Sequence, residues 1–92
     1  MYTLASFDIK FKTNQDNIEK IFQHYGLRKL QSSLYAGDLD NSERELLKEN
    51  INEIIRENDS VLIIPICQSC YSKKEICGRE IKFKDELYRV YG

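Results

Sequence analysis

The chain has 92 residues, of which 41% are hydrophobic and 32% charged, and its formal net charge is −1. A chain of this length forms one domain with a modest core, so we expect a single domain over residues 1–92 that gains stability from self-association. The near-neutral charge excludes the strongly basic character that is typical of nucleic-acid binders. Any basic patch must therefore come from uneven distribution of the charges.

The sequence also predicts where the protein is found. No apolar run approaches the roughly 18 residues that a membrane span needs, so we expect no membrane partner. The first residues lack a basic segment followed by an apolar stretch, so we expect no signal peptide. Three cysteines without a secretion signal indicate reduced thiols and a cytoplasmic location.

The first part of the chain predicts a strand, a helix and a second strand. The near-continuous apolar run over residues 2–9 predicts a central strand. A helix capped by Thr13 or Asn14 follows, and Gly26 stops it. Its apolar positions recur at helical spacing and are Ile18, Ile21, Phe22 and Tyr25. Polar and apolar side chains alternate over residues 28–35, which predicts one strand with a solvated face.

A second helix and a second buried strand come next. Asn41 or Ser42 caps this helix, and Glu45 stands where a capping box with Ser42 requires it. The apolar stripe of the helix consists of Leu46, Leu47, Ile51, Ile54 and Ile55. After a turn at residues 58–59, the apolar run over residues 60–66 predicts a buried strand.

The last part of the chain gives weaker signals. Residues 67–78 form an irregular stretch with room for one helical turn, and weak strands are expected over 81–83 and 87–90. The element order predicts an α+β sandwich of ferredoxin-like type, with two helices on one face of an antiparallel sheet. The trailing strand pairs either with the edge of its own sheet or with the edge of a partner.

Asp8 is the most informative candidate residue, because it closes the first predicted strand. Asp is a poor strand residue, so either chemistry or a turn places it there. A carboxylate at a strand end is held rigidly, which suits a hard cation such as Mg²⁺. One carboxylate binds Mg²⁺ weakly, whereas two copies related by a two-fold axis make a usable site. The alternative role of Asp8 is to cap the following loop.

Several short segments together point to a known family. They are residues 2–9, 25–28, 31–39, 59–61 and 65–67. The most specific features are the strand that ends in Asp8, the Gln-x-Ser-hydrophobic-aromatic motif that starts at Gln31, and the Asp-Ser-Val motif that starts at Asp59. In this order and spacing they closely resemble the CRISPR-associated protein 2 family, the small subunit of the spacer-acquisition complex.

This resemblance implies a ferredoxin-like fold and a symmetric homodimer, in which the two sheets face each other and the C-terminal strand pairs with the other protomer. It also implies a role in CRISPR adaptation, where the dimer bridges dimers of the integrase subunit and holds double-stranded prespacer DNA. Family members are described as Mg²⁺-dependent endonucleases on RNA or DNA. In them the acid that matches Asp8 comes from both protomers, so the resemblance makes Asp8 the catalytic and metal-binding residue.

The chain departs from the family pattern just after Asp8. Many members carry acidic residues there, followed by arginines in the first helix, whereas residues 10–17 of this chain have Lys10 and Lys12 and no arginine. Phe7 stands where Tyr is frequent, so a role that needs that hydroxyl is lost. These departures concern nuclease strength and phosphate contacts rather than the fold.

Basic and polar residues beside the first two strands are candidates for nucleic-acid binding. As a group, Lys10, Lys12, Arg28 and Lys29 could neutralise phosphates without reading sequence, although each alone fits a solvated surface. Three neighbouring polar residues could donate hydrogen bonds to phosphates or to each other. They are Gln31, Ser32 and Ser33.

The spacing of the three cysteines suggests a metal knuckle, but the set of ligands is incomplete. Cys67-x-x-Cys70 with Cys77 gives three ligands, and structural zinc needs four. The one histidine, His24, lies in a predicted helix far away in sequence. Thioredoxin-like redox chemistry would need the cysteine pair at a helix start after a strand, in a different fold, and local packing is the remaining role.

Three functions compete on these observations. The first is a DNA-binding scaffold of the adaptation complex, and the second is a Mg²⁺-dependent endonuclease that acts by itself. The third is a small ferredoxin-like regulatory or protein-interaction module without nuclease activity. Mg²⁺-dependent cleavage favours the second, and a pocket between the helices and the sheet favours the third.

Overall fold

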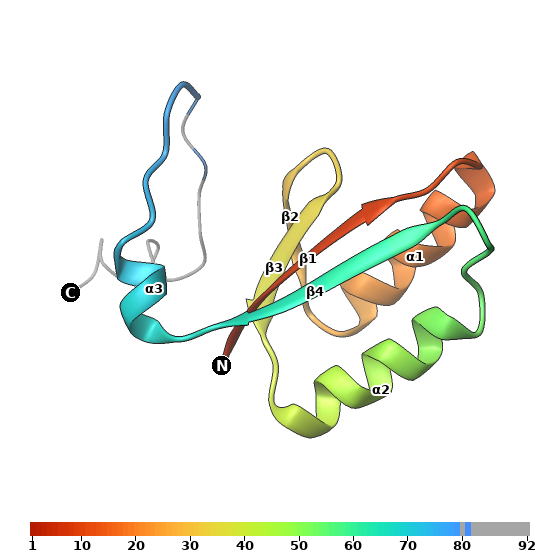
Figure 1. Cartoon of the computed structure of the whole chain (residues 1–92), viewed down its shortest axis with the longest axis horizontal. Helices are drawn as coiled ribbons and strands as arrows, with labels where there is room; N and C mark the ends of the chain where they lie inside the picture. Colours follow the sequence, from red (N-terminus) through yellow and green to blue (C-terminus); the bar gives the residue numbers. More distant parts are fainter. Residues whose placement is uncertain (80, 82–92) are drawn as a thin grey trace.

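The computed structural model describes residues 1–79 and 81, which form a four-stranded sheet and three helices. The elements in chain order are β1 (Tyr2–Asp8), α1 (Lys12–His24), β2 (Arg28–Gln31), β3 (Leu34–Asp38), α2 (Asn41–Asn52), β4 (Ser60–Ile66) and α3 (Gln68–Ser72). Neighbouring strands are antiparallel, in the order β2-β3-β1-β4. The helices α1 and α2 lie together on one face of this sheet (Figure 1). The predicted ferredoxin-like α+β sandwich is therefore confirmed.

Strand β1 is one of the two inner strands of the sheet, which confirms the central position that its apolar sequence predicts. It pairs with β3 on one side and with β4 on the other. Alternate side chains of β1 point to opposite faces, and Thr3 and Ala5 are fully buried against the helices. The core consists of Ala5, Ile9, Ile18, Phe22, Leu27, Tyr35, Leu39, Leu47 and Ile51. It fills the layer between the sheet and the two long helices.

Strand β4 is less buried than its apolar sequence predicts. Val61 and Ile63 pack against the core, whereas Leu62 and Ile64 are 58% and 43% exposed. The prediction of a buried strand is wrong, because α1 and α2 cover only one face of the sheet. On the other face, Leu62 and Ile64 stay exposed among the described residues, and we call this face, which also carries Leu4 and Ser6, the open face.

The stretch predicted as one strand over residues 28–35 is a hairpin. Its two strands, β2 and β3, are joined at Ser32 and Ser33, so that Lys29 pairs with Tyr35. A register shift between Lys29 and Gln31 marks an irregularity in this pairing. No Gly, Pro or Asn marks the turn. The alternation of polar and apolar residues therefore runs through it, and the sequence reads as one strand. The hairpin converts the predicted order into β-α-β-β-α-β, which is the ferredoxin-like order.

The helix starts differ from the predicted caps. Helix α1 begins after Phe11, whose side chain has no hydrogen-bond acceptor to cap it. Asn14 lies inside the helix and donates a hydrogen bond to Asp59. Its predicted stop is confirmed, since Gly26 has a φ of +83°, a conformation that glycine adopts without strain.

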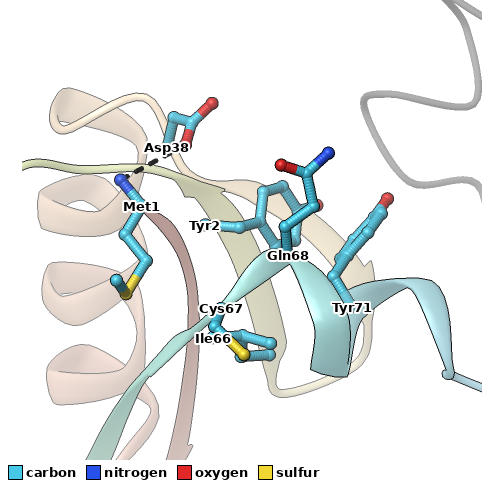
Figure 2. Close-up of a pocket in the computed structure, with 7 residues that line it drawn as sticks. All are labelled: Met1, Tyr2, Asp38, Ile66, Cys67, Gln68 and Tyr71. Atoms are coloured by element: carbon cyan, nitrogen blue, oxygen red, sulfur yellow. Dashed lines mark ion pairs between the residues drawn. The ribbon is translucent and has the colours of Figure 1, made fainter.

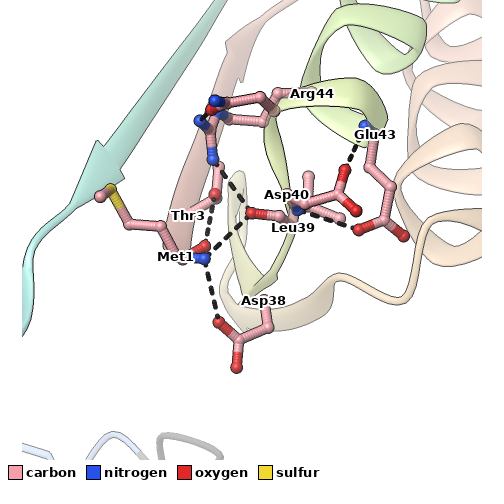
Figure 3. Close-up of polar contacts among 8 residues, drawn as sticks. Met1, Thr3, Asp38, Leu39, Asp40, Glu43 and Arg44 are labelled. Carbon is pink, nitrogen blue, oxygen red and sulfur yellow. Dashed lines mark hydrogen bonds and ion pairs between the residues drawn. The ribbon is translucent and has the colours of Figure 1, made fainter.

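Helix α2 begins at a capping box between Asp40 and Glu43, rather than between Ser42 and Glu45. The Asp40 side chain accepts a hydrogen bond from the Glu43 amide at 2.8 Å, and the Glu43 side chain accepts one from the Asp40 amide at 2.9 Å (Figure 3). The Met1 ammonium and the Arg44 guanidinium both donate to the Leu39 carbonyl, at 3.1 and 3.0 Å. These bonds join the start of β1 to the start of α2.

Helix α3 follows β4 directly, within the stretch predicted to be irregular. The strands predicted over 81–83 and 87–90 fall, apart from Ile81, outside the residues that the structure describes. Pairing of a C-terminal strand therefore stays a prediction. Within residues 1–79 and 81, no helix is long and apolar enough to cross a membrane.

Candidate metal and phosphate site

A polar pocket of about 350 Å³ lies where β1 ends. Residues from β1, α1, β2 and the turn of the hairpin line it. They are Phe7, Asp8, Ile9, Lys12, Gln15, Glu19, Lys29, Ser32 and Ser33. Five of the residues predicted for catalysis or nucleic-acid binding thus line one pocket: Asp8, Lys12, Lys29, Ser32 and Ser33.

Asp8 is held at the rim of this pocket by the pairing of its strand. Asp8 pairs with Ser60 of β4, and the preceding amide of Phe7 donates to the Ser33 carbonyl at 3.2 Å. This second bond brings the hairpin turn beside Asp8. The Asp8 carboxylate is exposed, and it forms no ion pair with the residues that the structure describes. It is therefore available to a cation that arrives with a phosphate.

Glu19 is a second acid of the pocket, and sequence reasoning missed it. The Tyr35 hydroxyl donates to the Glu19 carboxylate at 2.7 Å, and the Lys29 ammonium lies 3.8 Å from the same oxygen. Burial, and then the hydrogen bond to Glu19, raise the pKa of Tyr35, so its hydroxyl remains a donor at neutral pH. Glu19 thus orients Lys29, while the Asp8 carboxylate stays open.

Asp59 fixes the segment that follows Asp8. Its carboxylate accepts hydrogen bonds from the Lys10 amide at 3.3 Å, the Asn14 side chain at 3.4 Å and the Arg56 amide at 3.1 Å. Desolvation opposes ionisation of Asp59, but the hydrogen bonds from Arg56, Lys10 and Asn14 outweigh it and hold the pKa of this carboxyl below its usual range. The sequence predicts Asp59 as part of a turn and as the start of the Asp-Ser-Val motif, with no role for its side chain. In the structure it holds the loop between Asp8 and α1.

A further hydrogen bond fixes the same loop from inside the pocket. The Gln15 side chain donates to the Ile9 carbonyl at 2.8 Å. Lys12, one helical turn earlier, forms an ion pair with Asp16 at 3.1 Å on the exposed surface of α1. Such an exposed pair is weak and readily exchanged for a phosphate.

The other predicted nucleic-acid residues lie outside the pocket. Lys10 is exposed and belongs to the loop that Asp59 holds. Arg28 pairs with Ala36, whereas Lys29 pairs with Tyr35. Alternation along β2 therefore places Arg28 on the open face and Lys29 on the helix side. Gln31 lines a separate pocket of about 470 Å³, together with Leu30, Ser32, Arg79 and Ile81.

The pocket residues fit Mg²⁺ only as an ion shared with a phosphate. Across residues 1–79 and 81, no group of three or more His, Cys, Asp or Glu side chains could hold a metal ion. Mg²⁺ keeps several waters and is commonly held by one or two carboxylates plus substrate phosphates. Asp8 supplies one such carboxylate. The same result leaves the cysteines, as far as they are described, without a closed zinc site.

Solved structures share the fold of this chain. The crystal structure of Streptococcus pyogenes Cas2 at pH 6.5 matches with a TM-score of 0.72 and 20% identity, over 85% of this chain and 100% of that one. A hypothetical protein from Thermus thermophilus matches with a TM-score of 0.74 and 19% identity, over 88% and 96% of the two chains. The fold thus defines a small α+β domain of the kind that these two structures represent.

Sequence comparison narrows this class to one family. Residues 1–74 match the family described as CRISPR associated protein Cas2. A CRISPR-associated endoribonuclease Cas2 of Archaeoglobus fulgidus is 32% identical over 73 residues, which are 78% of each chain. A CRISPR-associated endoribonuclease Cas2 of Thermofilum pendens is 28% identical over 99% of this chain and 100% of that protein. The chain belongs to the Cas2 family, which confirms the predicted family.

Proposed function

We propose that this protein acts in CRISPR adaptation, as a homodimer that binds double-stranded prespacer DNA and bridges dimers of the integrase subunit. We also propose a Mg²⁺-dependent endonuclease centre at Asp8, which hydrolyses phosphodiester bonds of RNA or DNA. The observation that carries the proposal is the Cas2 family match over residues 1–74, combined with an exposed Asp8 at the rim of a pocket that two lysines also line. The names of the relatives support a nuclease, since they are called endoribonucleases.

The open face of the sheet supports the homodimer. Leu62 and Ile64 are exposed on it, and the register of β1 and β4 places them beside Ser6 and Leu4. An apolar strip of this kind marks an interaction surface on a small domain. A two-fold axis through this face would bring a second Asp8 toward the first, because Asp8 ends the same row of β1 side chains.

The residues of the pocket have separate roles in the proposed chemistry. When bound, Mg²⁺ would supply positive charge at a phosphate, with Asp8 as its protein ligand. Lys12 and Lys29 neutralise phosphate oxygens, and the hydroxyls of Ser32 and Ser33 donate hydrogen bonds to them. Glu19 orients Lys29, and Asp59 holds the loop that leads to Lys12.

Assembly is tested by mixing the full chain with its cognate integrase subunit and a duplex with frayed ends, followed by gel filtration and light scattering. We expect one complex that contains all three components and two copies of this chain. The protein alone should bind the duplex weakly, and the partner should strengthen binding sharply because linked sites add their effects. A stable monomer at micromolar concentration would contradict the dimer.

Cleavage is tested with Asp8→Asn, which keeps the shape of the side chain but loses the charge that holds a divalent ion. We expect loss of Mg²⁺-dependent cleavage of RNA and DNA to background, with an unchanged circular dichroism spectrum. Glu49→Gln is a control for the loss of one acidic charge, since Glu49 is an exposed acid of α2, away from the pocket. Equal cleavage by wild type and Asp8→Asn would show that Asp8 is not the metal ligand.

A further inference from the structure

The segment after β4 holds two cysteines in an arrangement that the proposed function does not use. Cys67 follows the last residue of β4 and is the N-cap of α3, and Cys70 lies in the first turn of that helix. Figure 2 shows Cys67 at the junction of strand and helix, beside Ile66. A cysteine pair at a helix start after a strand is the local arrangement that thiol–disulfide chemistry needs.

The geometry of this turn suits a disulfide between the two cysteines. The Cys70 amide donates to the Cys67 sulfur at 3.4 Å, and the next amide, of Tyr71, donates to the Cys67 carbonyl at 3.0 Å. Helical geometry places Cα atoms three residues apart at about 5 Å. Disulfides join Cα atoms about 4.4–6.8 Å apart, so the pair can close without moving the backbone far.

Both sulfurs are accessible, and their environments differ. Cys67 and Cys70 are exposed free thiols. The hydrogen bond from the Cys70 amide, and then the bond from the Cys70 thiol, lower the pKa of Cys67. The hydrogen bond to Cys67 and the charge on its sulfur raise the pKa of Cys70. Cys67 is therefore the better nucleophile of the pair, and Cys70 keeps its proton until a second step.

The surroundings tie this turn to the sheet. The Tyr71 ring lies edge-on against the Tyr2 ring, with centroids 4.8 Å apart. Both tyrosines line a pocket of about 540 Å³ together with Cys67, and Figure 2 shows these side chains around it. A small disulfide can therefore reach Cys67 from this pocket, one side of which is formed by Tyr2 of β1.

We propose that Cys67 and Cys70 form a redox-active dithiol, which reacts reversibly with disulfides of low-molecular-weight thiols. The Cys67 thiolate attacks one sulfur of the disulfide, and the mixed disulfide forms as one small thiolate leaves. The Cys70 sulfur then attacks Cys67, releases the second small thiol and gives up its proton. Two electrons pass from the pair to the reagent, which becomes two thiols, and the protein gains one intramolecular disulfide. This proposal is independent of the nuclease and of DNA binding.

The pairing is tested on the full chain, equilibrated in mixtures of reduced and oxidised glutathione and then alkylated. Trypsin places Cys67 and Cys70 in one peptide, residues 57–73, and Cys77 in another, residues 75–79. Mass spectrometry should show peptide 57–73 with an internal disulfide and peptide 75–79 alkylated. The Cys77→Ser variant should give the same equilibrium constant as wild type. A disulfide that includes Cys77, or glutathione adducts spread over all three cysteines, would overturn the proposal.

The order of attack is tested with single variants. In Cys70→Ser the reaction should stop at a glutathione adduct on Cys67, because the second thiol is missing. In Cys67→Ser the remaining Cys70 should react several-fold more slowly at pH 7 than Cys67 does in Cys70→Ser, because only the sulfur at position 67 accepts the hydrogen bond from the amide of residue 70, which stabilises a thiolate there. Equal initial rates for Cys70→Ser and Cys67→Ser would show that Cys67 is not the attacking thiol. Circular dichroism of both variants checks that the exposed substitutions leave the fold intact.

Discussion

The two faces of the sheet are built from alternate residues of the same strands, and they differ in what covers them. On the helix side, Ala5 and Tyr35 are almost fully buried. On the open face, Leu62 and Ile64 remain 58% and 43% exposed, although their neighbours Val61 and Ile63 in the same strand pack against the core. An apolar strand therefore does not by itself show that both faces are covered within one chain. The open face is the surface on which a second protomer can add burial.

The largest expected loss of stability comes from removing a core side chain on the helix side of the sheet. Phe22 is fully buried, and its ring lies 5.1 Å from that of Tyr35. Phe22→Ala should lower the free energy of unfolding by about 3–5 kcal/mol, because it removes apolar contacts and leaves a cavity. Urea denaturation measures this loss. Phe11→Ala is the control, since Phe11 is 60% exposed, and it should cost less than about 1 kcal/mol.

Substitutions on the open face should weaken association of the proposed dimer more than they destabilise the fold. Replacing Leu62 and Ile64 together by Ser should raise the dimer dissociation constant about 30- to 1,000-fold, since burial of these side chains contributes about 2–4 kcal/mol. Analytical ultracentrifugation over a concentration series measures the constant. Leu46→Ser is the matched control, because Leu46 is 53% exposed on α2, on the helix side. A dimer of unchanged affinity would place the interface elsewhere.

The two basic residues of β2 lie on opposite faces of the sheet, so variants of each test which face binds nucleic acid. Lys29 lies on the helix side and lines the pocket that has Asp8 at its rim, whereas Arg28 lies on the open face, the face to which alternation along β1 assigns Asp8. Lys29→Gln should weaken duplex binding and lower its salt slope by about one unit per lost phosphate contact. Fluorescence anisotropy at several salt concentrations measures the slope.

Comparing Lys29→Gln with a double variant and a control shows which surface contacts the phosphates of the duplex. Reversing Arg28 and Lys29 together to Glu should impair assembly on DNA without unfolding the protein. Lys48→Gln is the control, since Lys48 lies on α2, paired with Glu45 at 3.2 Å. An unchanged slope for the double variant would mean that the phosphates follow another surface.

The smallest effect concerns Asp59, which joins loops at the end of the sheet. Its folded pKa is lowered, so its ionised form stabilises the fold above the unfolded pKa of about 3.9. That contribution is lost as the pH falls through the folded pKa. Asp59→Asn should therefore be less stable than wild type at pH 7, and the difference should shrink below about pH 4. Urea denaturation at pH 7 and pH 3, with Glu57→Gln as an exposed control, measures this change.

Local sequence patterns predict the parts of the fold that depend on near neighbours. The central strand β1, the stop of α1 at Gly26 and the ferredoxin-like class follow from apolar periodicity and glycine. The cap of α2 does not, because Asp40, Asn41 and Ser42 are all competent to cap a helix. Contacts at the start of β1 and α2 decide between them. The turn of the hairpin is hidden for a related reason, since Ser32 and Ser33 fit a strand or a turn.

The candidate site divides in the same way. Asp8 is visible in sequence because an acid at the end of an apolar strand is unusual. Glu19 and Asp59 are not, because their roles depend on partners far along the chain, Tyr35 for Glu19 and Lys10 for Asp59. Arg28 and Lys29 are adjacent in sequence, yet strand alternation sends them to opposite faces. The sequence groups them as one basic patch, and only the register of β2 shows that they lie on different faces.

The position of β1 at the centre of the sheet has a consequence for synthesis of the protein. Tyr2 pairs with Asp38 on one side and with Ile66 on the other, so β1 can be hydrogen-bonded on both sides only after residue 66 has been translated. Its second neighbour is translated only after both long helices. Pairing across such sequence distances slows folding and leaves strand edges exposed in the meantime. Nascent chains that stall before residue 66 should therefore depend on chaperones more than chains released at full length.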